Sequence, residues 1–115
     1  MSDELLVDLV SRPDSCDVRP WLDLARSGHL VSLGELEPEE SLRILERLLD
    51  LNPVRLVAVD PESDDEFTTT NVLVIQLPPS PDSRAEFFMI ESEHAVSTGF
   101  DPEPDIGQRF LMMKW

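Results

Sequence analysis

The sequence has a single cysteine, Cys16, among its 115 residues. One thiol excludes an internal disulfide and a multi-cysteine zinc site, and both absences suit a reducing compartment. No apolar run exceeds five residues, whereas a membrane-spanning helix needs about 20. The N-terminal segment is acidic where a secretory signal is basic. We therefore expect a cytoplasmic protein with no membrane partner.

Basic residues are also scarce. Nine Lys and Arg, of which only Lys114 is a lysine, face 24 Asp and Glu, and the formal net charge is -15. Neutralisation of phosphates supplies most nucleic-acid affinity, so this composition argues against a nucleic-acid partner. The acidity indicates either a basic protein partner or simple solubility, because net charge governs association and solubility rather than fold.

The motifs of common enzyme and cofactor sites are absent from the sequence. It contains no P-loop, no GxGxxG or GxSxG element, no CxxC pair and no RNP-like aromatic motif. Nucleotide hydrolysis, dinucleotide binding, hydrolase nucleophiles, zinc ribbons and RNA recognition therefore have no support. We expect no cofactor.

Two apolar stretches dominate what is present, residues 54–59 and 72–77. Their length and their β-branched residues favour strands, and both stretches are apolar on both faces. A sheet built around them must therefore be covered on each side. The acidic connection between them, residues 61–70, is predicted to be a solvated hairpin loop.

Helical patterns flank these strands. Residues 38–51 begin with proline and acids and carry a broad apolar face, which predicts a helix. Residues 81–98 begin with a proline and are followed by a glycine, which predicts another. The alternative for residues 84–91 is a strand after a hairpin loop, because short apolar runs cannot be typed by their period alone. Two shorter helices are predicted within residues 1–28.

Strands at residues 29–36 and 109–115 complete the pattern strand, helix, strand, strand, helix, strand. This order predicts an α+β fold, a ferredoxin-like βαββαβ two-layer sandwich with an N-terminal helical arm. One domain, 1–115, then consists of the arm, 1–28, and the α+β core, 29–115. Because the first strand is less apolar than a central position requires, another α+β fold with an antiparallel sheet is the alternative.

Two core helices cover only one face of such a sheet. The other face must be covered by the N-terminal arm or by a second copy of the chain, and the second possibility predicts a homodimer. The 81–98 helix has apolar residues on two sides. Its residues Phe87, Ile90 and His94 are therefore predicted to form an interface.

One candidate for chemistry lies on the same helix. Glu91 precedes His94 by three residues and shares its helical face, so the pair is suited to bind a metal or to act as base and orienter. Arg109 is the arginine assigned to such a catalytic site, because its guanidinium can bind a carboxylate or phosphate. The alternative is an ordinary surface or interface histidine.

A second candidate is the acidic run between the two apolar stretches. Asp60, Glu62 and Asp64 stand at alternate positions, which suggests loose binding of calcium or magnesium. An EF-hand is excluded, because Asp65 stands where its loop needs glycine and Asn71 where it needs glutamate. The alternative is a solvated loop.

Three functions are compatible with these features. The first is a small interaction or regulatory module that self-associates. The second is an acidic inhibitor, an immunity-type protein or a DNA mimic that binds a basic partner. The third is a small-molecule or metal-dependent enzyme. The absence of a recognised catalytic motif favours the first.

Overall fold

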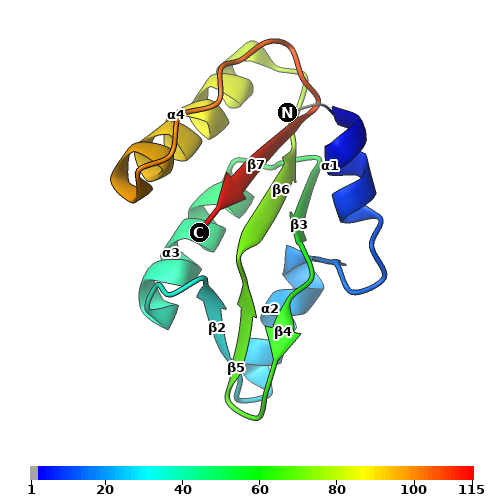
Figure 1. The fold of residues 1–115 in the computed structure, drawn as a ribbon, viewed down its shortest axis with the longest axis vertical. Coiled ribbons are helices and arrows are strands. Elements are labelled where there is room, and N and C mark those ends of the chain that lie inside the picture. The colour runs from blue at the N-terminus through cyan, green and yellow to red at the C-terminus, as the bar shows by residue number, and fades with distance from the viewer. Residues whose placement is uncertain (1–2) are drawn as a thin grey trace.

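The computed structural model describes residues 3–115, except for the side chain of Arg26. Figure 1 shows helices packed around a strongly bent set of strands. The helices are α1 (Asp3–Val10), α2 (Val18–Arg26), α3 (Pro38–Asp50) and α4 (Pro81–Thr98). The strands are β1 (Cys16–Asp17), β2 (Leu30–Leu33), β3 (Arg55–Ala58), β4 (Glu62–Ser63), β5 (Phe67–Thr70), β6 (Val72–Gln76) and β7 (Phe110–Lys114). Within residues 3–115, no helix combines the length and apolarity needed to cross a bilayer.

The predicted α+β class is confirmed, with four helices and an antiparallel sheet in the described residues. The helix predicted over 81–98 is confirmed as α4, so the alternative of a strand at 84–91 is wrong. Pro81 opens this helix, and Gly99 closes it with a left-handed φ of 83°, the conformation that favours glycine after a helix. The helix predicted over 38–51 is confirmed as α3, with Glu39 and Glu40 in its first turn.

The two apolar stretches form the arms of one long hairpin. β3 pairs with β6 near its base, and β4 pairs with β5 near its tip, both antiparallel. The sequence predicted a solvated loop for the connection of residues 61–70. This prediction is wrong for most of the connection, because its residues pair as β4 and β5. Thr68 and Thr70 are buried there, and the Thr70 hydroxyl donates a 2.7 Å hydrogen bond to the carbonyl of Val59. Such bonds allow polar side chains to occupy a strand interior.

The hairpin belongs to two sheets, with the strand orders β1-β3-β6-β7 and β2-β5-β4. β2 and β7 lie on the same side of the long arm formed by β5 and β6, and they meet end to end. The Gly34 amide donates to the Thr70 carbonyl, and the Trp115 amide donates to the Asn71 carbonyl. Gly34 has a φ of +56°, and a Cβ there would lie 2.6 Å from that of Trp115. The meeting point therefore requires glycine.

This pairing does not confirm the predicted ferredoxin-like order. That order places the first predicted strand, residues 29–36, at the centre of one sheet, between the last strand and the strand at 72–77. In the structure β7 pairs with β6, and β2 pairs with β5. The physical reason is the length of the hairpin arm. Because β5 and β6 together span residues 67–76, they accommodate both strands in sequence along one side.

Both faces of the sheet are covered by the chain itself. α2, α3 and α4 pack on one face, around a core that includes Trp21, Leu45 and Phe87. On the other face Leu6 and Val10 of α1 lie against a group of sheet residues. These residues are Val57, Val59, Val74 and Phe110. Of the two predicted coverings, the structure has the N-terminal arm, of which only α1 lies on this face (Figure 1). The second helix of the arm, α2, packs on the other face.

Candidate functional site

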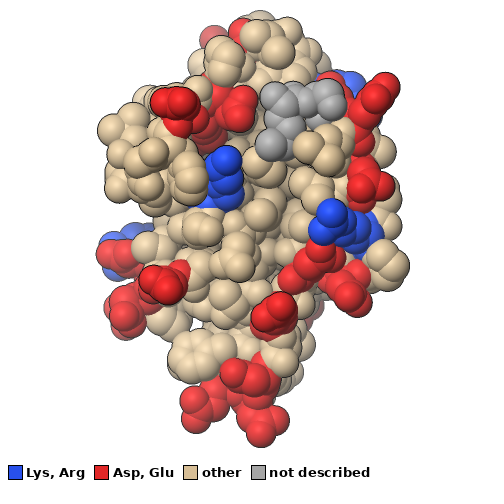
Figure 2. Space-filling model, viewed as in Figure 1, with Lys and Arg blue, Asp and Glu red and all other residues tan. Residues whose placement is uncertain are grey.

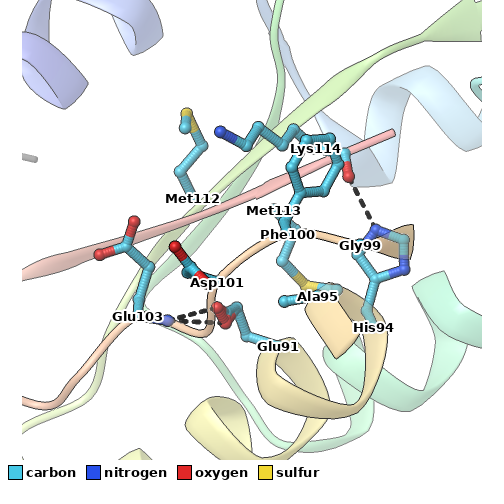
Figure 3. Close-up of a pocket in the computed structure, with 10 residues that line it drawn as sticks. All are labelled: Glu91, His94, Ala95, Gly99, Phe100, Asp101, Glu103, Met112, Met113 and Lys114. Atoms are coloured by element: carbon cyan, nitrogen blue, oxygen red, sulfur yellow. Dashed lines mark hydrogen bonds between the residues drawn. The ribbon is translucent and has the colours of Figure 1, made fainter. Parts of the chain in front are cut away.

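A pocket of about 330 Å³ lies between β7, the C-terminal half of α4 and the loop that follows α4 (Figure 3). Its volume is within the range of small-ligand sites. We call it the β7 pocket. It is lined by Glu91, His94, Ala95, Gly99, Phe100, Asp101, Glu103, Met112, Met113 and Lys114.

Glu91 forms the inner wall of the β7 pocket. α4 turns Phe87 and Ile90 into the core, and this packing carries the neighbouring Glu91 inward, so that it is only 3% exposed. Its Oε1 accepts a 2.8 Å hydrogen bond from the backbone amide of Glu103. The carboxyl group thus ties the loop after α4 to the helix (Figure 3).

Burial raises the pKa of the Glu91 carboxyl above its usual value, and the nearby charge of Glu103 raises it further. The amide of Glu103 and the charge of His94 act in the opposite direction without cancelling the effect of burial. A raised folded-state pKa means that the folded protein binds this proton more tightly than the unfolded chain does. The stability contributed by protonation is present at low pH and is lost as pH rises through the folded pKa.

The Glu91→Gln variant is therefore expected to have a higher free energy of unfolding than wild type. This difference is expected to be larger at pH 7.5 than at pH 4.5. Glutamine keeps the acceptor for the Glu103 amide but cannot ionise. Urea unfolding at a series of pH values measures the difference. Glu86→Gln, on the exposed side of the same helix, is the control for losing one charge. Equal pH dependence in the two variants would contradict the raised pKa.

His94 lies at one end of the pocket and contacts the end of β7 and Trp115. Its Nε2 lies 2.8 Å from the carbonyl of Lys114, and since a carbonyl can only accept, Nε2 carries the proton and donates. The ring also packs on Trp115, with 4.4 Å between centroids. His94 therefore fastens the end of β7 to α4.

The β7 pocket already contains one positive charge next to an aromatic ring. The Lys114 ammonium lies 4.7 Å from the centroid of the Phe100 ring, within the range of a cation–π contact. The carboxylates of Glu91, Asp101 and Glu103 line the same pocket. This combination of acids and a ring face is suited to cations.

No family model, curated protein or solved structure matches the chain.

The structure brings together two of the three predicted catalytic residues. Glu91 and His94 both line the β7 pocket, but their polar atoms bond to different backbone groups and not to each other. Arg109 does not line the pocket. Its guanidinium lies 5.2 Å from the ring centroid of Phe110, and its backbone amide donates to Asp3.

The three carboxylates predicted to bind a metal have separate roles. Asp60 forms a 2.6 Å ion pair with Arg12, and Glu62 is exposed in β4. Asp64 accepts the amides of Phe67 and Glu66 at the hairpin tip, and these bonds hold the pKa of Asp64 below its usual value. Across residues 3–115, no group of three or more His, Cys, Asp or Glu is placed to hold a metal ion.

Two of the three predicted interface residues lie in the core. Phe87 is 0% exposed and Ile90 is 4% exposed, both within the chain's own apolar cluster. They offer no surface to a partner in this structure. Self-association itself stays a prediction, and any interface would have to be formed by other residues.

Several pocket residues were not identified from the sequence as parts of a site. Asp101 and Glu103 belong to the loop after α4. Phe100 lies near the start of that loop, and Lys114 is the last residue of β7. The acidic loop and the single lysine are visible in the sequence. These residues come together because the chain runs back from the end of α4 to β7. Local sequence patterns do not specify this path.

Proposed function

We propose that this chain is an interaction module that binds a positively charged segment of a partner protein at the β7 pocket. The observation that carries the proposal is the placement of the Lys114 ammonium on the Phe100 ring, in a pocket that Asp101 and Glu103 also line. The chain's own lysine is a chemical stand-in for a lysine or arginine of the partner. Cation–π contact and charge complementarity are the interactions that such a residue would gain.

The charge distribution outside the pocket supports a basic partner. The chain has 24 Asp and Glu but only nine Lys and Arg, so its own basic residues cannot neutralise most of its carboxylates. Figure 2 shows acidic side chains gathered at the hairpin end of the molecule. A net charge of -15 creates a long-range field that speeds encounter with a cationic protein. An acidic inhibitor of a basic enzyme is one form that this function can take.

The two other functions receive less support from the geometry. Self-association was predicted from an uncovered sheet face, and α1 packs on that face. The enzyme alternative rested on Glu91 and His94, and both side chains are bonded to backbone groups of the fold. The basic-partner function needs no catalytic group, and we therefore prefer it.

Titration with an eight-residue peptide that alternates lysine and valine tests the proposal. At an ionic strength of about 0.15 M we expect saturable one-to-one binding, which weakens at least about tenfold as salt is raised to about 0.5 M. Replacing Lys114 with alanine is expected to tighten binding by roughly 2- to 5-fold, because the Phe100 ring loses its internal cation. Isothermal titration calorimetry measures both effects.

The matched control is Arg19→Ala, which removes the same charge from an exposed position on α2. It is expected to change the affinity much less than Lys114→Ala. Absence of saturable binding at low salt, or an equal effect of the two variants, would reject a cation site at the β7 pocket.

A further inference from the structure

β7 is the edge strand of its sheet, and one side of it has no strand partner in the described chain. Antiparallel ladders pair alternate residues through the backbone. The Leu77 amide donates to the Arg109 carbonyl, and the Trp115 amide donates to the Asn71 carbonyl. By this alternation the odd-numbered residues of β7 bond to β6, and the backbone groups of Phe110, Met112 and Lys114 point away from it.

Side chains occupy the two ends of this open edge. The Phe110 amide donates to Asp3 Oδ1 at 3.3 Å, and the Lys114 carbonyl accepts from His94 Nε2 at 2.8 Å. Between these ends, the Phe110 carbonyl, both backbone groups of Met112 and the Lys114 amide have no hydrogen-bond partner within residues 3–115. Four consecutive backbone groups are thus free to pair with an added strand.

The free groups face the β7 pocket. Met112 has the same parity on the strand as Lys114, whose carbonyl points toward His94 on α4 (Figure 3). Met112, Met113 and Lys114 line the pocket from the strand side, and Glu91 and His94 line it from α4. The site therefore has a strand edge on one side and a helix on the other, which is an arrangement that receives extended peptides in strand-addition complexes.

We propose that the partner enters the β7 pocket as an extended segment that adds to the edge of β7 as a further strand, with basic residues at alternate positions. This inference rests on the proposed function and specifies its mode of binding. The backbone of the segment bonds to Met112 and its neighbours, and alternate side chains fall on one side because a strand has a period of two. The carboxylates of Asp101 and Glu103 then face the basic side chains.

Charge complementarity favours a basic segment over a second copy of this chain. Pairing β7 with the β7 of another copy brings two acid-lined pockets together, and each copy carries a net charge of -15. Like charges that face each other across an interface oppose association. A basic segment of another protein removes this repulsion.

Amide hydrogen exchange measured by NMR tests the inference, with the alternating lysine and valine peptide as the probe. In the free protein the amides of Met112 and Lys114 are expected to exchange quickly, and the amide of Met113, which pairs with Leu73, slowly. Saturation with the peptide is expected to slow Met112 and Lys114 at least about tenfold. A second peptide of equal charge, in which every backbone amide is N-methylated, cannot donate to the ladder in either register and is expected to bind at least about tenfold more weakly.

The outcomes separate this inference from the proposed function. Equal binding of both peptides with no protection of Met112 would overturn strand addition and leave a cation site in place. Failure of both peptides to bind would overturn both proposals. Equal protection by a glutamate and valine peptide would overturn the basic character of the segment. Protection without peptide that grows with protein concentration would assign the edge to a second copy and overturn a separate partner.

Discussion

Replacement of Phe87 with alanine is expected to lower the free energy of unfolding by about 3–5 kcal/mol and to leave the oligomeric state unchanged. The ring is completely buried in the core formed with α3 and the sheet, so truncation removes apolar burial and leaves a cavity. Urea unfolding gives the stability, and sedimentation equilibrium gives the mass. If the variant does not fold, Phe87→Leu keeps most of the volume and allows a smaller loss to be measured.

Met89→Ala is the control on the same helix. Met89 is 46% exposed, so its truncation is expected to change stability by no more than about 0.5 kcal/mol. The interface role predicted for Phe87 from the sequence has a different signature. A Phe87 variant with an unchanged unfolding free energy and an altered mass would contradict the core assignment.

Replacement of Leu6 with alanine is the second large expected effect, a loss of about 2–5 kcal/mol. Leu6 is 2% exposed and packs with Val57, Val74 and Phe110 on the sheet face that α1 covers. The variant weakens the only helix described on that face, so exposed apolar surface is also expected to increase. Urea unfolding and binding of an apolar fluorescent dye measure the two consequences.

Leu5→Ala provides the comparison, because Leu5 is 46% exposed on the same helix. Its effect is expected to stay within about 0.5 kcal/mol. Equal stability of the Leu5 and Leu6 variants would show that α1 is not the covering of the second face. A second copy of the chain would then again be the candidate for that role.

The secondary structure could be predicted where local signals and burial agree. α3 and α4 begin at Pro38 and Pro81. The apolar residues of α3 follow a helical period and meet the core, whereas α4 is apolar on two sides and was predicted from its end signals, Pro81 and Gly99. β3 and β6 were recognisable because both of their faces are apolar and both are buried. The need for a second covering also followed from this pattern, and α1 meets it.

The strand pairing could not be predicted in the same way. Thr68 and Thr70 belong to an acidic connection that was predicted to be a loop. The Trp21 indole donates a 2.8 Å hydrogen bond to the Thr68 hydroxyl, which makes the burial of Thr68 acceptable. This bond joins residues far apart in sequence. The position of β7 depends on the close approach of Gly34 and Trp115, which no periodic pattern specifies.

The candidate site was predicted only in part for a related reason. Helical spacing predicts Glu91 and His94 on one side of the helix, and both line the β7 pocket. It did not indicate that Glu91 binds the Glu103 amide or that His94 binds the Lys114 carbonyl. Phe100 and Lys114 contact each other only after the chain has turned back along α4. The β7 pocket forms because segments that are separated in the sequence pack together in this way.

The most direct measurement compares two double variants in the titration with the lysine and valine peptide. One variant, Asp101→Asn with Glu103→Gln, removes two carboxylates from the β7 pocket. The other, Asp65→Asn with Glu66→Gln, removes two from the exposed hairpin tip. If the pocket is the binding site, the first is expected to weaken binding at least about tenfold, equivalent to about 1.4 kcal/mol, and the second by less than about twofold. Equal weakening would instead mean that the acidic surface as a whole attracts the peptide and that the β7 pocket is not its site.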